Sequence, residues 1–236
     1  DLIVANQLRF MLNKDLGYEK NQLVVMKRIY PLNNSIQTFC REIEKIPGVA
    51  SATNSTTYLG FNNSTETFQI KGRDASKNFL FATNHVDYEF MKTYNFKLAD
   101  KEGRFFDYKY STDTSAILIN SAAVKEYGIN DPYSTMILEP ALEGDTNYLR
   151  LIGVVEDFHH SSLRDPVGPY MLRFKSDDPS WAGYITLRLG VAGKGVTSTL
   201  NRIRKVWMKM SNEAPFQYFF LNDELDDYYK EEKRTG

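Results

Sequence analysis

Residues 22–29 read QLVVMKRI, and they open a unit that predicts how the start of the chain folds. The apolar run is typical of a buried strand, and residues 35–46 follow it as an amphipathic helix. The apolar residues of that helix recur at helical spacing: Ile36, Phe39, Cys40, Ile43 and Ile46. Pro47 and Gly48 end the helix, and residues 49–53 complete a β-α-β unit.

The same pattern returns near the end of the chain. Residues 184–189 (YITLRL) predict a strand, residues 196–210 a helix and residues 216–221 (FQYFFL) a second strand. Two such units can share one four-stranded sheet with two helices on one face, the split β-α-β arrangement. We therefore predict an α+β fold in which residues 1–56 and 181–236 form one discontinuous, ferredoxin-like subdomain. Residues 57–180 are then an insertion into it.

The insertion is predicted to be mainly β. Strands are expected at residues 67–72, 79–86, 116–119, 149–155 and 170–174. Short helices are expected at residues 88–94 and 121–127, the second after Asn120, a good N-cap. Outside the insertion, residues 1–16 carry a wide apolar stripe at helical spacing, and a last helix is expected at residues 222–234.

Composition excludes several classes of protein. The formal net charge is -1, so no excess of positive charge favours nucleic acid or an anionic membrane, and we expect no nucleic-acid partner. Cys40 is the one cysteine of the sequence, which leaves no intrachain disulfide and no cysteine-based zinc site. No apolar run approaches the ~20 residues of a membrane-spanning helix. Both ends read as boundaries within a longer protein.

Three motifs suggest chemistry, and each has a simpler explanation. Residues 190–197 (GVAGKGVT) lie between a strand and a helix, but they lack the glycine spacing of a phosphate loop and a Ser or Thr directly after Lys194. His159 and His160 are adjacent, whereas zinc ligands converge from separated positions. The acidic residues at 223–227 suit the first turns of a helix. We predict no catalytic residues, no metal site and no cofactor.

Five motifs occur in a fixed order along the chain: residues 10–25, 103–106, 116–124, 152–163 and 215–232. The most specific is residues 152–163, IGVVEDFHHSSL, followed by Pro166 and Pro169. In this order and spacing the motifs resemble the extracytoplasmic core domain of MacB/FtsX-type ABC transporter permeases. The resemblance spans nearly the whole chain.

The resemblance implies a porter-like subdomain made from both chain ends and an inserted, β-rich, sabre-like subdomain. It also implies a non-catalytic periplasmic domain of an inner-membrane permease. The expected partners are the transmembrane helices of its own chain, a cytoplasmic ATPase subunit or domain, and an extracytoplasmic adaptor or substrate. Such a domain would couple ATP hydrolysis to substrate movement, such as efflux, or to regulation of a partner such as a cell-envelope enzyme.

On this reading, the helices at residues 1–16 and 222–234 act as paired levers, because both enter the same sheet. The candidate lever residues are Leu8 and Leu12 in the first helix and Leu225 and Tyr228 in the second. Rigid helices transmit displacement when they pack on a close-packed core. Proline at Leu8 or Leu225 is therefore expected to uncouple ATP turnover from transport.

Residues 157–163 are expected to form a corner where a strand of the insertion turns. The candidate residues are Asp157, Phe158, His159, Ser161 and Leu163. Phe158 and Leu163 would be buried, and Asp157 or Ser161 would accept hydrogen bonds from local backbone donors, close to them in the sequence. A docking site for a partner is the alternative interpretation of the same residues.

Two other functions stay open. A ligand-sensing ectodomain of a membrane receptor would also have two membrane-proximal ends, but it should contain a defined pocket. A secreted enzyme is opposed by the lack of a nucleophile, base and oxyanion site in the sequence.

Overall fold

The structure is a computed structural model. It describes residues 22–60, 63–141, 144–161, 165–174, 183–191 and 194–235. The helix expected at residues 1–16, with Leu8 and Leu12, lies outside the described residues, as does Leu163. Helices and a mixed sheet are both present, so the predicted α+β class is confirmed.

Strands from both ends of the described chain form one antiparallel section of the sheet, which we call the terminal sheet. Its strands are β1 (Leu23–Met26), β2 (Val49–Ser55), β9 (Tyr184–Leu189) and β10 (Tyr218–Phe220). Their order is β10-β1-β9-β2. Val24 on β1 pairs with Phe220 on one side and with Leu187 on the other. The earliest and latest described strands are therefore neighbours.

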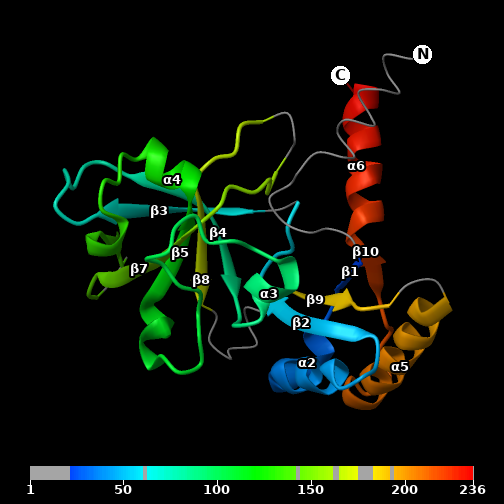
Figure 1. The fold of residues 1–236 in the computed structure, drawn as a ribbon. Helices are drawn as coiled ribbons and strands as arrows, with labels where there is room; N and C mark the ends of the chain where they lie inside the picture. The colour runs from blue at the N-terminus through cyan, green and yellow to red at the C-terminus, as the bar shows by residue number, and fades with distance from the viewer. Residues whose placement is uncertain are drawn as a thin grey trace.

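Two helices cover one face of the terminal sheet (Figure 1). They are α2 (Ile36–Glu44), which follows the 3-10 helix η1 (Tyr30–Ser35), and α5 (Lys194–Met210). Each presents an apolar stripe to the sheet, and the rings of Phe39 and Trp207 meet edge-on with centroids 5.8 Å apart. Gly48, with φ of +100°, supplies the turn between α2 and β2.

The middle of the chain forms a closed β-barrel. Its strands are β3 (Ser64–Ile70), β4 (Phe79–Val86), β5 (Ala116–Asn120), β6 (Met136–Glu139), β7 (Asn147–Val155) and β8 (Tyr170–Phe174). Around the ring the described strands run β4-β3-β6-β7-β5-β8, and β8 pairs back to β4 in parallel.

Apolar side chains fill the barrel, and we call this cluster the barrel core. Its buried members are Phe68, Ile70, Phe79, Phe81, Ile117, Ile119, Ala123, Ile129, Ile137, Leu149, Leu151 and Met171. Ala123 comes from the short helix α4 (Ser121–Glu126), and Tyr127, which follows α4, packs edge-on against Phe79 and Phe81. Among the polar groups, Arg173 donates to both carboxylate oxygens of Glu139 at 2.6 and 2.9 Å.

β6 is a strand that the sequence analysis missed. It has four residues, of which Ile137 alone is fully buried, so neither length nor alternation marks it clearly. It nevertheless joins β3 to β7 and so completes the ring. The 3-10 helix η3 (Pro132–Ser134) precedes β6, and η2 (Ser111–Ser115) precedes β5.

The other elements lie within a few residues of their predicted positions. The first strand ends at Met26 and not at residue 29, and Arg28 has a positive φ of 54°, which is incompatible with a strand. The strand expected at residues 67–72 begins and ends earlier, as β3. The last strand is shorter than expected because α6 (Leu221–Thr235) begins directly after β10.

The terminal sheet meets the barrel where β2 approaches β4. In the described residues these two strands share the register pair Ser55↔Val86. Figure 1 shows α6 leaving the terminal sheet on the side away from α2 and α5, with the C-terminus at its far end. The division into two subdomains stays a prediction.

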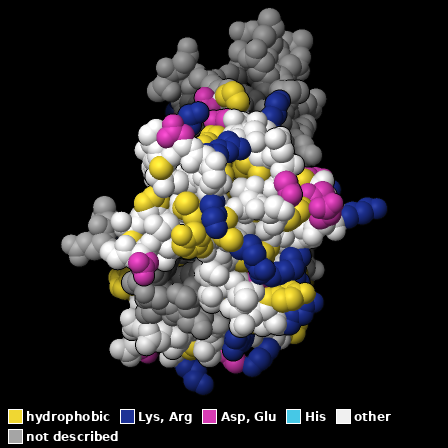
Figure 2. All heavy atoms as spheres, turned by 90° about the vertical axis from the view of Figure 1, so that its left-hand side faces the viewer, with side chains coloured by type: hydrophobic (Ala, Val, Ile, Leu, Met, Phe, Trp, Pro, Cys, Tyr) yellow, Lys and Arg dark blue, Asp and Glu magenta, His cyan; other side chains and the backbone are white. Residues whose placement is uncertain are grey.

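The outer surface of the barrel carries apolar and basic side chains together. Strand register places Leu138 and Tyr148 opposite each other on the outward face, and Leu80 and Tyr148 are exposed. The ammonium of Lys71 lies 5.7 Å from the centroid of the Tyr148 ring. Figure 2, which views the molecule from the barrel side, shows hydrophobic side chains interspersed with Lys and Arg on this surface.

Gly153→Ala is expected to destabilise the fold. A Cβ at this position of β7 would lie 2.5 Å from the carbonyl oxygen of Arg104, whose own N–H donates to Ile152. The close atom belongs to a backbone that is hydrogen-bonded to β7, so the clash can be relieved only if the segment around Arg104 moves. We expect this to cost about 1–3 kcal/mol of stability. Chemical denaturation of the variant measures the loss in free energy of unfolding.

Gly168→Ala is the matched control, since an added Cβ there meets no atom within 4 Å. Equal stability of the two variants would contradict the steric account.

Candidate functional site

One apolar cluster contacts the terminal sheet, the barrel and α6 together, and we call it the shared core. Its buried members are Leu23, Val25, Tyr58, Leu59, Val86, Phe90, Met91, Tyr94, Phe96, Phe106, Ala116, Leu118, Ile152, Val155, Phe158, Tyr170, Leu172, Leu221 and Leu225. Strands β1, β5, β7 and β8 and helix α6 each contribute side chains to it. Because its members come from the terminal sheet, the barrel and α6, this cluster is the candidate functional site.

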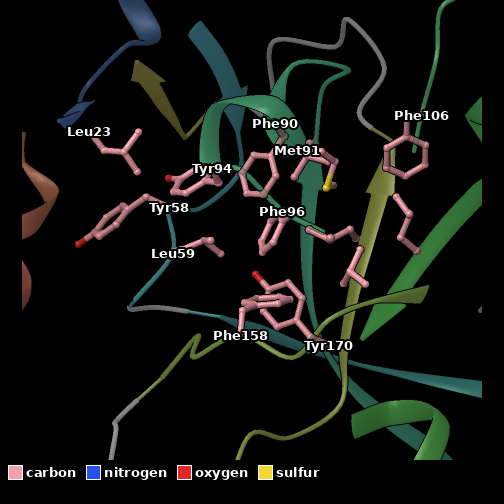
Figure 3. Packing of buried hydrophobic residues seen from close by; sticks show 14 of the residues in the cluster. Leu23, Tyr58, Leu59, Phe90, Met91, Tyr94, Phe96, Phe106, Phe158 and Tyr170 are labelled. Atoms are coloured by element: carbon pink, nitrogen blue, oxygen red, sulfur yellow. The ribbon is translucent and has the colours of Figure 1, made fainter. Parts of the chain in front are cut away.

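Helix α3 (Phe90–Tyr94) lies at the centre of the shared core (Figure 3). The ring of Phe90 lies 4.6 Å from that of Tyr94 and 5.8 Å from that of Phe96, between centroids. Asn95 ends the helix with φ of 55°, a left-handed conformation that asparagine tolerates better than most residues. This turn returns Phe96 to the same cluster as the helix.

Buried polar contacts fasten α3 to the terminal sheet. The hydroxyls of Tyr94 and Thr186 lie 3.0 Å apart, and Thr93 donates its hydroxyl to Ser51 at 3.0 Å. Arg188 on β9 donates its Nε–H to the carbonyl of Thr93 at 2.8 Å. Burial raises the pKa of Tyr94, so its hydroxyl stays protonated at neutral pH. These contacts fix α3 against β2 and β9.

Helix α6 is seated in the shared core by its first two turns. Leu221 is fully buried and Leu225 is 1% exposed, while Tyr228 packs against the cluster from its edge. Next to them the Tyr58 ring meets those of Tyr184 and Phe219 edge-on, with centroids 4.9 and 5.1 Å apart. Desolvation, with the nearby charge of Glu224, raises the pKa of Tyr58 to about 12.

The sequence-predicted corner borders the same cluster. Phe158 is 1% exposed, and its ring lies 4.7 Å from Phe96 and 4.8 Å from Tyr170, between centroids. Asp157 is exposed and accepts a 2.7 Å hydrogen bond from the backbone N–H of Ala122, in the first turn of α4. The carboxylate thus receives a backbone donor, but from α4, 35 residues away in the chain, and not from a neighbouring residue.

Of the other corner residues, His159 and Ser161 lie outside the cluster. His159 is half-buried and Ser161 is exposed, and Leu163 lies outside the described residues. His160 is buried beside Phe158, and burial lowers its pKa. In the described ranges no three His, Cys, Asp or Glu side chains come together as a metal site.

The sequence analysis missed the structural roles of Asn120 and of helix α3. Asn120 was identified as an N-cap, and its Oδ1 accepts from the Ala123 N–H at 3.2 Å, but it also accepts from the Tyr170 N–H at 2.9 Å. Its Nδ2 donates to the carbonyl of Gly168 at 2.9 Å, so one side chain joins α4 to β8. Helix α3 was predicted as a helix, but its place at the centre of the shared core was not. The close spacing of its aromatic residues was a usable signal of burial.

Comparison with solved structures finds similar folds at low sequence identity. The periplasmic region of MacB from Actinobacillus actinomycetemcomitans aligns with a TM-score of 0.57 and 13% identity, covering 93% of this chain and 98% of that one. A domain assigned to a permease of Porphyromonas gingivalis aligns with a TM-score of 0.54 and 19% identity, covering 84% and 89%. The extracellular domain of the noncanonic ABC-type transporter YknZ from Gram-positive bacteria gives 0.52 and 13%, covering 77% and 86%.

Comparison by sequence finds no match among protein-family models or among curated proteins. The solved structures that align with this chain confirm, at the level of the fold, its resemblance to the extracytoplasmic core domain of MacB/FtsX-type permeases. Within the described ranges, none of the helices has both the length and the apolar character that a bilayer crossing requires.

Phe158→Ala is expected to lower the free energy of unfolding by about 3–5 kcal/mol, because it empties a buried aromatic site that packed neighbours cannot refill. Thermal and chemical denaturation measure the effect. His159→Ala, at the half-buried neighbouring position, serves as the control. An unchanged melting temperature in Phe158→Ala would contradict a structural role for this ring.

Proposed function

We propose that this chain is the non-catalytic extracytoplasmic domain of an ABC transporter permease. It would couple ATP hydrolysis in the cytoplasm to movement of a substrate, or to regulation of a partner, outside the inner membrane. The observation that carries the proposal is the shared core, in which α6 and the outer wall of the barrel contact the same side chains. The similar folds of transporter domains support it.

Helix α6 has the properties of a lever. Its fifteen residues span about 22 Å at ~1.5 Å per residue, and Leu221 and Leu225, one turn apart, anchor its first end. A close-packed cluster transmits displacement because it is poorly compressible. Movement of the far end of α6 would therefore reach α3 and Phe158, and through them the barrel. The companion lever expected at residues 1–16 remains part of the proposal.

The porter-like and sabre-like division is also proposed. The terminal sheet combines residues from both ends of the chain, and the barrel uses the middle of it. In the described residues β2 and β4 share the register pair Ser55↔Val86, and this short strand pairing supports the boundaries at 56/57 and 180/181. The barrel could then move relative to the terminal sheet with most of its strand pairs intact.

The proposed setting follows from this role. The domain would lie in the periplasm, attached to the inner membrane through the transmembrane helices of its own chain and served by a cytoplasmic ATPase subunit or domain. An adaptor or the substrate would meet it outside the membrane. The corner at residues 157–161 would serve as a structural joint, since Phe158 belongs to the shared core.

Electron spin labels can test the relay in the full permease with its ATPase. Labels at Lys125 on α4 and Asp227 on α6, both exposed, report the distance between barrel and lever. We expect this distance distribution to change between nucleotide-free and ATP-trapped states. Phe96→Ala, which removes a ring from the centre of the shared core, should reduce or abolish the change while ATP is still bound.

Phe68→Ala is the matched control, because it removes a buried ring from the barrel core, outside the shared core. It should leave the nucleotide-dependent change intact. Leu225→Pro, which breaks α6 at its anchored end, should act like Phe96→Ala. A full distance change in Phe96→Ala, or its equal loss in Phe68→Ala, would refute the relay.

A further inference from the structure

A buried carboxylate lies where the terminal sheet meets the barrel. Asp87 follows β4 directly, one residue beyond the Ser55↔Val86 pair, and it is 6% exposed. The relay through the shared core does not use it. In the described residues no basic side chain forms an ion pair with it, so its charge is balanced by hydrogen bonds alone.

Both sides of the seam supply those hydrogen bonds. From β2, the Thr53 hydroxyl donates to Oδ1, and the backbone N–H and side-chain Nδ2 of Asn54 donate to Oδ2 at 3.0 and 2.8 Å. From the segment before α3, the Glu89 N–H donates to Oδ1 at 3.1 Å. Asn54 Nδ2 also donates to Gln37 on α2 at 3.0 Å. One carboxyl group therefore links β2, β4 and the approach to α3.

We propose that Asp87 is a proton-binding latch, which holds the seam between the terminal sheet and the barrel closed when protonated and favours its opening when ionised. A carboxylate gains hydration when the seam opens, whereas a neutral carboxyl gains much less. The Thr53 hydroxyl can reverse from donor to acceptor, so it can accept a hydrogen bond from the protonated carboxyl. The mechanical meaning of the latch rests on the proposed function, but proton binding itself does not.

Burial and hydrogen bonding act on the pKa of Asp87 in opposite directions, and burial is the larger effect. Burial raises the pKa of Asp87 to about 6. The charge of Glu89 also raises this pKa, whereas the hydrogen bonds from Thr53, Asn54 and Glu89 lower it. The charges of Asp87, of Glu89 and of Arg41 on α2 all act on the hydroxyl of Tyr108, which lies on a neighbouring segment. The side chains of β2 and α2 that are hydrogen-bonded to Asp87 or to Asn54 (Thr53, Asn54 and Gln37) are uncharged, and Arg41 of α2 is hydrogen-bonded to Tyr108.

The sign of the pH effect follows from linkage. The pKa of Asp87 in the closed seam is higher than that of a solvated carboxyl, so proton binding stabilises the closed form. This contribution is fully present below pH ~4 and is lost as the pH rises through about 6. Between pH 5 and 7.5 the opening equilibrium should shift roughly tenfold toward the open form.

Amide hydrogen exchange in the 236-residue chain tests the latch directly, by NMR and without the permease. The Asn54 and Glu89 amides donate to Asp87, so their protection factors, corrected for intrinsic exchange, should fall roughly tenfold from pH 5 to 7.5. Amides of β5 inside the barrel should not change. In Asp87→Asn the pH dependence at residues 54 and 89 should disappear.

A carbon-13 titration of the Asp87 carboxyl in the unaltered chain gives a second measurement that needs no variant. A midpoint near pH 6 is expected. A midpoint at or below pH 4, or protection factors that do not depend on pH, would overturn the latch. Either failure would leave the relay untouched, since the relay is tested by nucleotide-dependent distances.

Discussion

The packing of the aromatic rings in and after α3 between the terminal sheet, the barrel and α6 is the interaction on which the rest of the structure depends. Phe90, Tyr94 and Phe96 lie in one cluster with side chains of β1, the outer wall of the barrel and α6. Hydrogen bonds from Thr93 and Tyr94 fix the helix to the terminal sheet at the same time. A five-residue helix would not persist alone, so tertiary contacts hold it in place.

The fold therefore has two connections of different physical character between its ends and its middle. The shared core is apolar, closely packed and insensitive to pH, because its tyrosines stay protonated. The seam at Asp87 is polar, and its strength varies with protonation under the proposed latch. A stiff connection and an adjustable one lie side by side at α3, since Glu89 immediately precedes that helix.

Sequence pattern was most informative where one face of an element is buried. The spacing of Ile36, Phe39 and Ile43 predicted α2, and strands β4, β8 and β9 were predicted with their observed bounds. Pattern failed for β6, whose short and half-exposed run depends on its neighbours for its conformation. Barrel closure and the central place of α3 depend on contacts between distant segments, which periodicity does not encode. Asp87 carried no local signal at all.

Closure of the barrel limits how another protein can join it. Each barrel strand that the structure describes has a paired neighbour on both sides, so the ring has no edge strand to offer to an incoming strand, although β3 and β6 share only the pairs Gln69↔Leu138 and Ile70↔Ile137. A binding protein must instead recognise side chains, such as the exposed Leu80 and Tyr148 with Lys71 beside them. The same closure protects the barrel from the edge-to-edge aggregation to which open sheets are prone.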